Sequence, residues 1–201
     1  MPPGVNLALL WPEFLVTALA FLVFTADFLL AREQKAWLGW ATAVGLLAAT
    51  GFSLWFLWGV QEDLYGGLVK VDPYSLFFKG LILPLGAAIA LLSVQYTGKY
   101  LAHPGEYYGI LLLSLVAMLL LAASGELLTA YISLELLSFS LYILASYARQ
   151  DPKSNEAGVK FILLGAFSSA ILLYGIALLY GALGTTRFAE MAAALEAGKE
   201  A

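Results

Sequence analysis

The residue best placed to do chemistry in this sequence is Glu135, a carboxyl in the middle of a long apolar stretch. It lies about eight residues into the stretch 127–147, which at about 1.5 Å per helical residue is roughly 12 Å from one end and near mid-bilayer. A charge at that depth costs at least about 2.5–3.5 kcal/mol, so such groups usually pair or line an ion pathway. Burial favours the protonated carboxyl and a nearby lysine favours the charged form, so moving a lysine would switch its proton affinity. Glu135 is therefore predicted to handle protons or cations.

Hydroxyl-bearing side chains continue along the same face of this helix. Tyr131, Ser138 and Tyr142 stand at offsets of −4, +3 and +7 from Glu135, and side chains at these offsets share a helix face. They form a polar stripe on an otherwise apolar helix. The alternative interpretation is purely structural, with a protonated Glu135 hydrogen-bonded to a neighbouring hydroxyl.

Two lysines are candidate counter-charges for Glu135. Lys79 and Lys160 lie near opposite ends of the membrane, and Ser168 follows Lys160 two turns along its helix face. Neither lysine matches Glu135 in depth, so its counter-charge is expected from outside this segment. The alternative for both is to snorkel to the interface, as lysines near helix ends do. We retain Lys160 as a candidate for proton translocation and expect Lys79 to snorkel.

Two further carboxyls lie in the first apolar stretch. Glu13 follows Trp11 and Pro12 at the start of the predicted helix, where a negative charge complements the helix dipole. Asp27 lies near the other end of that helix, where the dipole disfavours it, so a partner is expected. We interpret Glu13, Asp27 and Lys79 as structural charges.

The composition indicates whether these charged side chains lie in water or in a membrane. The chain has 201 residues, of which 62% are hydrophobic and 12% charged, whereas soluble domains carry roughly 45–50% apolar and 25% charged residues. The apolar stretches are continuous and of helix length, which favours helices over the alternating strands of a barrel. An all-α integral membrane protein is predicted, with six transmembrane helices at about 7–30, 37–58, 74–95, 108–124, 127–147 and 157–181.

Residues 1–186 are thus expected to form a transmembrane bundle. In the remaining 187–201, Phe188, Met191 and Leu195 recur at helical spacing, which predicts a short amphipathic helix in the interface, leading to further spans. Asp151 and Pro152 predict the N-cap and first residue of the sixth helix.

Basic residues predict the orientation. Arg32, Lys35, Lys99, Arg149 and Lys153 gather on one side. The other side has Lys70, Arg187 and Lys199. The first side is predicted to be cytoplasmic, with the N-terminus outside, in a multi-pass protein of the cell membrane.

Several kinds of site are excluded within this chain. There is no cysteine and His103 is the single histidine, so no metal site and no thiolate-held iron–sulfur cluster is expected. No glycine pattern of a nucleotide site follows a strand, so no cofactor site is expected either. The net charge of −4 argues against binding of nucleic acid.

Motifs at several separate places share one resemblance. They are residues 132–142, 154–161 and 164–169, together with Val71-Asp72-Pro73 ahead of the third predicted helix. These stretches resemble the N subunit of the proton-translocating NADH–quinone oxidoreductase, respiratory complex I, in the antiporter-like family. The Gly-Ala-Phe-Ser-Ser run at 165–169 favours the N subunit over its M and L relatives.

The resemblance implies a subunit that moves protons while partner subunits pass electrons from NADH to quinone. Glu135 matches the family's fifth-helix glutamate, which pairs with a lysine on the seventh helix, and Lys160 matches the lysine that opens the sixth. FMN, iron–sulfur clusters, NADH and quinone would lie on partner subunits, and other antiporter-like membrane subunits and the lipid bilayer would surround the chain. Family members continue into a second, inverted repeat. The chain resembles the first part of such a bundle and is not expected to be active alone.

Two other functions stay open. The chain could be a structural membrane scaffold, in which case Glu135→Gln would be silent while changes at Gly165 or Ser169 would disturb assembly. It could also be part of a multi-subunit cation/proton antiporter.

Overall fold

Long apolar helices account for most of the chain, which the computed structural model describes over residues 6–31, 34–101 and 103–197. Six of them are long and apolar enough to cross a membrane. These are α1 (Trp11–Leu29), α2 (Trp37–Leu57), α3 (Pro73–Tyr100), α4 (Pro104–Ala122), α5 (Leu127–Ala145) and α6 (Pro152–Leu183). A 3-10 turn, η1 (Leu7–Leu10), precedes α1, and a shorter helix, α7 (Phe188–Ala197), follows α6. The all-α membrane fold predicted from composition is confirmed.

Local capping chemistry starts the two longest helices. At α3, the Asp72 carboxylate accepts a hydrogen bond from the Ser75 backbone N–H at 2.7 Å, and the Ser75 hydroxyl accepts one from the Asp72 N–H at 3.1 Å. This reciprocal box satisfies donors that the first turn of a helix leaves free. At α6, the Asp151 carboxylate accepts from the Lys153 N–H at 3.0 Å, which confirms the N-cap predicted there.

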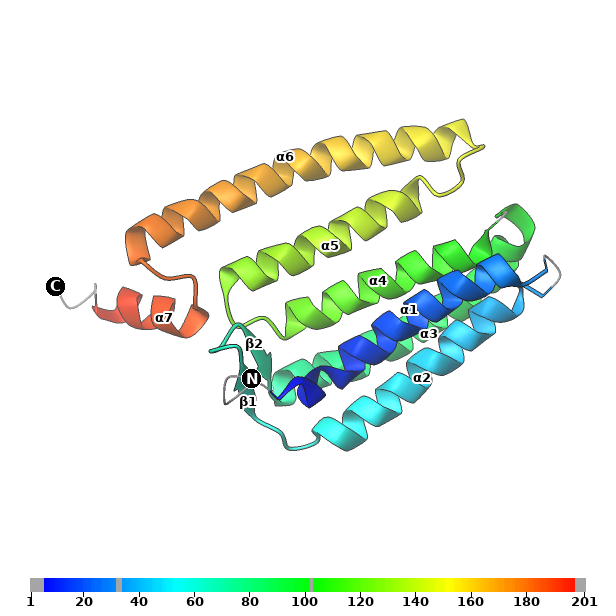
Figure 1. The fold of residues 1–201 in the computed structure, drawn as a ribbon. Helices are drawn as coiled ribbons and strands as arrows, with labels where there is room; N and C mark the ends of the chain where they lie inside the picture. The colour runs from blue at the N-terminus through cyan, green and yellow to red at the C-terminus, as the bar shows by residue number, and fades with distance from the viewer. Residues whose placement is uncertain (1–5, 32–33, 102, 198–201) are drawn as a thin grey trace.

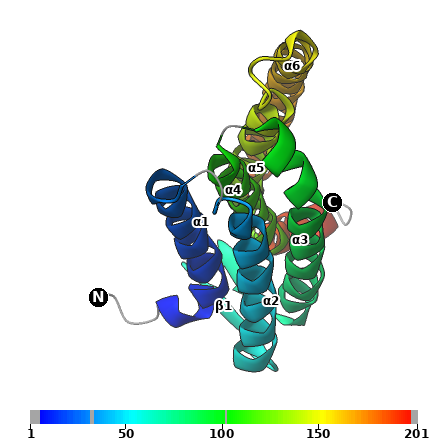
Figure 2. The ribbon, with the colours of Figure 1, turned by 90° about the vertical axis from the view of Figure 1, so that its right-hand side faces the viewer.

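The first four spans form a closely packed group, and the last two lie to one side of it (Figure 1). Side chains from all four helices share one apolar core, with Val16, Leu46, Leu83 and Leu112 essentially inaccessible to solvent. Helix α5 packs on α4, and α6 packs on α5 at the edge of the bundle. The turned view in Figure 2 likewise places α6 farthest from α1, α2 and α3. Along α6, Gly158 and Ile176 are the only residues that the described part of the chain buries.

A small β-hairpin covers one end of the bundle, where the sequence suggests only a connection between two spans. Strand β1 (Glu62–Leu64) pairs antiparallel with β2 (Val69–Val71). Leu64, Val69 and Val71 are buried against η1, the end of α2 and the start of α3 in a second apolar core. We call this end of the molecule the hairpin end.

The hairpin also holds the turn between α4 and α5. The Lys70 N–H donates to the Ala123 carbonyl at 2.6 Å, and the Gly125 N–H donates to the Leu68 carbonyl at 2.8 Å. Gly125 lies so close to the Gly67 carbonyl that any side chain there would clash with it. The hairpin therefore links the first four helices to the start of α5, the helix that carries Glu135.

Replacement of Gly125 by alanine tests this link. Gly125→Ala should destabilise the protein by about 1–3 kcal/mol, because the new methyl group meets rigid backbone and cannot be accommodated by a side-chain rotation. The thermal unfolding midpoint of the assembled protein in mild detergent measures the effect. Gly98→Ala in α3 is the matched control, because open space surrounds Gly98. Equal midpoints for Gly125→Ala and the wild type would contradict the close approach.

Candidate functional site

Glu135 lies near the middle of the 19-residue helix α5, on the side that faces α6. Its carboxylate accepts a hydrogen bond from the hydroxyl of Ser169 on α6. The Ser169 oxygen also lies 3.1 Å from the hydroxyl of Tyr131, one turn before Glu135 on α5. Tyr131, Ser169 and Glu135 therefore form a continuous chain of hydrogen-bonding groups between two membrane-spanning helices.

The polar stripe predicted on α5 is only partly engaged in this chain. Tyr131 belongs to it, whereas Tyr142 is buried with its ring edge-on to Phe161, 4.9 Å between ring centroids. Ser138 is half-buried, and no hydrogen bond of its hydroxyl is found within the described ranges. The stripe thus divides into a hydrogen-bonding half near Tyr131 and a packing half near Tyr142.

Ser169, and not Ser168, contacts Glu135. Ser168, singled out in the sequence because it shares a helix face with Lys160, is exposed. The sequence carried a signal for Ser169, because it stands four residues after Gly165, and small residues at that spacing mark the face on which membrane helices approach closely. The Tyr142 hydroxyl indeed occupies the space beside Gly165.

Lys160 lies far from Glu135 along the membrane. Nine residues separate it from Ser169 on α6, which corresponds to about 13 Å of helix rise. Its ammonium instead pairs with Glu156 one turn earlier, and 69% and 63% of the two side chains are exposed. Within the described ranges no lysine or arginine pairs with Glu135. Lys160 and Glu135 thus lie at different depths along the helices in the structure, as their positions in the sequence indicated.

Lys79 is the largest correction to the sequence-based interpretation. It does not snorkel: its side chain is 0% exposed, and its ammonium lies 2.8 Å from the carboxylate of Glu13, whose side chain is 5% exposed. Apart from this contact, neither charged group has a hydrogen-bond partner in the described part of the chain. A buried ion pair thus joins α1 to α3 close to the hairpin end. Sequence spacing could not indicate it, because the partners are far apart in the chain.

Asp27 has the partner that was expected, and more than one. Its carboxylate lies 3.1 Å from the Lys35 ammonium and 3.4 Å from Nδ1 of His103, and it accepts a hydrogen bond of 2.9 Å from the Gly105 N–H. Gly105 belongs to the first turn of α4, where free N–H groups and the helix dipole stabilise a negative charge. Arg32, predicted for the same side, lies outside the described residues, as does Lys199.

Tyr147 links α4 and α5 at the end of the bundle opposite to the hairpin end. Its hydroxyl donates to the His103 carbonyl at 2.7 Å and to the Glu106 carboxylate at 3.3 Å. Partial burial raises the pKa of the Tyr147 hydroxyl, and the neighbouring Glu106 charge raises it further. Tyr147 therefore stays protonated at neutral pH and remains a donor between the start of α4 and the end of α5.

Comparisons with known proteins identify relatives of this arrangement. Residues 124–201 match a family described as NADH:quinone oxidoreductase/Mrp antiporter, transmembrane. NADH-quinone oxidoreductase subunit N of Trichlorobacter lovleyi is 39% identical over 188 residues, which cover 94% of this chain and 38% of that protein. The chain thus spans about two-fifths of the length of the curated relatives that it resembles.

Solved structures show the same helix arrangement. A chain of respiratory complex I from Thermus thermophilus superposes with a TM-score of 0.69 at 33% identity, covering 88% of this chain and 38% of that one. A chain of the Mrp complex from Dietzia superposes with a TM-score of 0.67 at 25% identity, covering 89% of this chain and 20% of that one.

Removal of one member of the buried pair should destabilise the protein strongly. Glu13→Gln and Lys79→Met should each cost about 3–5 kcal/mol, because each leaves an uncompensated charge in an apolar interior, whereas the double variant should cost less than either single variant. Thermal unfolding of the assembled protein in detergent measures all three. Glu156→Gln, which breaks an exposed pair, is the control and should cost less than about 1 kcal/mol. Single variants as stable as this control would show that the pair does not carry full charges.

Proposed function

We propose that the chain, a member of the antiporter-like membrane subunits of NADH–quinone oxidoreductase with 39% identity to a subunit N, forms part of a proton-translocating subunit. The observation that carries this proposal is Glu135, a mid-membrane carboxyl bonded to a hydroxyl chain and paired with no described cation. Glu13, by contrast, pairs with the buried ammonium of Lys79. Glu135 instead has neighbours that can both donate and accept a proton.

The proposed step is a proton exchange at the Glu135 carboxyl. When a positive charge approaches, the charged carboxylate is stabilised and the proton leaves; when that charge withdraws, the carboxyl takes up a proton. Ser169 and Tyr131 supply the hydrogen-bonded route toward the hairpin end of α5. Their hydroxyls can pass a proton by exchanging donor and acceptor roles, without movement of the helices.

The approaching charge is proposed to be a lysine of the remaining protein, in line with the seventh-helix lysine that the resemblance implies. Lys160 would act earlier on the route, at the end of the membrane opposite to the hairpin. Its exposed ion pair with Glu156 is easily opened, since such pairs contribute little to stability. Lys160 would therefore exchange protons with the aqueous side rather than with Glu135 directly.

Electron transfer is assigned to partner subunits. The sequence has no cysteine to hold iron–sulfur clusters, so FMN, the clusters and the NADH and quinone sites are proposed to lie on other chains. Energy would reach this chain as a change of charge at its border with a neighbouring antiporter-like subunit. We further propose that the end carrying Lys35 and Arg149 faces the cytoplasm and that the hairpin end faces outward.

A second candidate, a subunit of a cation/proton antiporter, is supported by the likeness to the Mrp complex. In both cases Glu135 exchanges protons, and the two functions differ in the source of energy. Proton movement that depends on NADH oxidation favours the first, and movement that depends on a sodium gradient favours the second.

Glu135→Gln tests the proposal directly. In assembled complex within membrane vesicles, NADH-driven proton uptake should fall by about tenfold or more, because a positioned proton donor and acceptor contributes about 10²–10⁴-fold to a transfer step. The amount of assembled complex should stay close to wild type, since glutamine keeps the shape and one acceptor for Ser169. Normal uptake by a fully assembled variant would leave Glu135 a packing residue, and the scaffold function would then lead.

A second variant tests the hydroxyl chain. Ser169→Ala should lower proton uptake while leaving assembly intact, because it interrupts the contact between Tyr131 and Glu135. Ser140→Ala is the matched control: Ser140 is on α5 and buried, and among the described residues its hydroxyl bonds to the Leu136 carbonyl of its own helix. Equal uptake by the two serine variants would rule out a route through Ser169.

A further inference from the structure

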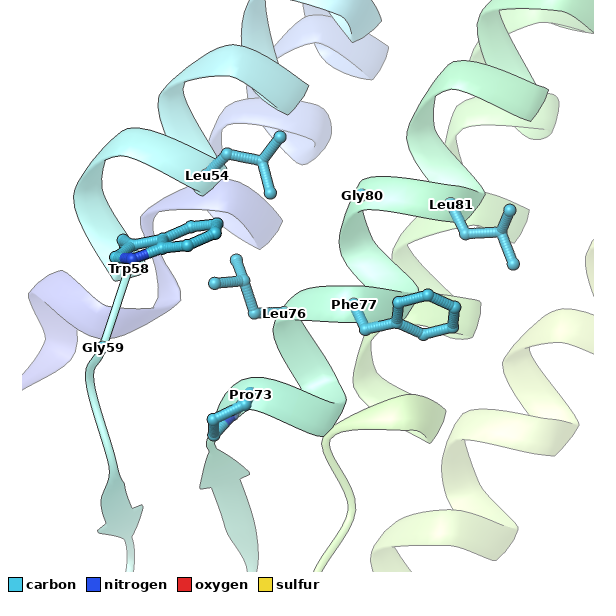
Figure 3. A pocket seen from close by; sticks show the side chains of 8 residues that line it. All are labelled: Leu54, Trp58, Gly59, Pro73, Leu76, Phe77, Gly80 and Leu81. Carbon is cyan, nitrogen blue, oxygen red and sulfur yellow. The ribbon is translucent and has the colours of Figure 1, made fainter.

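An apolar groove opens between the end of α2 and the start of α3, on the flank of the bundle away from α6 (Figure 3). Its volume is about 600 Å³, within the range of about 300–1,000 Å³ typical of small-molecule sites. Leu54 and Trp58 extend into it from α2, and Leu76 extends toward them from α3. The lining residues are Leu54, Trp58, Gly59, Pro73, Leu76, Phe77, Gly80 and Leu81.

The groove exists because Gly80 has no side chain. A Cβ at this position would already touch a Leu54 methyl group at 3.4 Å, so any larger side chain would fill the space between the helices. On the outer wall, Phe77 and Trp58 are 64% and 77% exposed. They face away from the core of the bundle, toward the surroundings of α2 and α3.

A polar recess adjoins the apolar groove at the hairpin. Its volume is about 460 Å³, and it shares Pro73 with the groove. Glu62, Asp63, Lys70 and Asp72 contribute charged groups to it, which gives three carboxylates against one ammonium. Asp72 is occupied in capping α3, whereas Glu62 and Asp63 are exposed and make no ion pair within the described ranges.

The order of these two surfaces, first apolar and then charged, matches a membrane lipid. An apolar slot leads into a charged recess, and the change occurs beside Trp58, an aromatic residue of the type that gathers at the membrane–water interface. A phospholipid has the same order along its length. The surplus of carboxylates favours a head group that carries a cation and disfavours a net anionic one.

We propose that this groove binds one phosphatidylethanolamine molecule from the adjacent leaflet. An acyl chain lies along Gly80 between Leu54 and Leu81. The ammonium lies among the carboxylates of the recess and donates hydrogen bonds to them, and the phosphate lies near Lys70. A choline head group, which has no N–H, cannot make these hydrogen bonds, and a glycerol head group leaves the carboxylates without a cation. The bound lipid would fill the gap at the hairpin end of α2 and α3.

Photolabelling in the assembled complex tests the site. The complex is reconstituted in vesicles with phosphatidylethanolamine bearing a photoreactive acyl chain, and labelled peptides are mapped by mass spectrometry. Label is expected on peptides containing Leu54 and Leu81. Gly80→Leu, which fills the slot, should reduce this label at least fivefold, whereas Gly98→Leu, in open space on the same helix, should leave it unchanged. Equal label in wild type and Gly80→Leu would overturn the proposal.

Head-group specificity is tested with matched probes. In the wild type, ethanolamine probe should label these peptides several-fold more than choline or glycerol probe. The double variant Glu62→Gln, Asp63→Asn removes the exposed carboxylates and should abolish that preference while label in the slot persists. Equal labelling by all three probes in the wild type would overturn the assigned head group. Crosslinks from the groove to a partner protein, in place of lipid, would show that a protein covers it and would equally overturn the proposal.

Discussion

The cost of a charge in hydrocarbon is the constraint on which this structure depends. Three carboxyls in the described spans, Glu13, Asp27 and Glu135, meet it differently. Glu13 is paired with the buried ammonium of Lys79, and Asp27 is paired with Lys35 and bonded to the first turn of α4. Within the described residues, the Glu135 carboxylate accepts a hydrogen bond from the Ser169 hydroxyl, which in turn contacts the Tyr131 hydroxyl. Permanent pairing suits a structural charge, whereas hydroxyl neighbours leave Glu135 free to change its protonation state. The same physical rule thus separates the charges that hold the bundle from the one proposed to work in it.

The paired charges also explain why the bundle divides as it does. The Glu13–Lys79 pair fastens α1 to α3, and the Asp27–Gly105 hydrogen bond fastens α1 to α4 at the opposite end. With the apolar core between them, the first four helices form a well-fixed support. Helix α5 rests on this support, and α6 is bound mainly by α5. Glu135 and Ser169 therefore sit between α5 and α6, at the exposed edge of the four-helix support, where a neighbouring charge can act on them.

Much of this could be predicted from local patterns in the sequence. Continuous apolar stretches revealed the six helices, and Glu135 was conspicuous because its depth follows from counting residues along one helix. Contacts between distant parts of the chain could not be predicted in this way. The hairpin pairs strands of three residues each, which are too short for their alternation to distinguish them from a connecting loop. The burial of Lys79 depends on Glu13, a partner on another helix. Likewise, Ser168 stood out in the sequence because it shares a helix face with Lys160, whereas the contact of Ser169 with Glu135 depends on how α6 packs on α5.

The most direct measurement of the central claim is the protonation state of Glu135 during turnover. Infrared difference spectra of the assembled complex, recorded before and after addition of NADH, report carboxyl groups that gain or lose a proton. We expect one carboxyl band that is missing from Glu135→Gln and shifted in Ser169→Ala, because the hydrogen bond to the carboxyl is then lost. An unchanged set of carboxyl bands in fully assembled Glu135→Gln would contradict the account, since Glu135 would then keep one protonation state throughout.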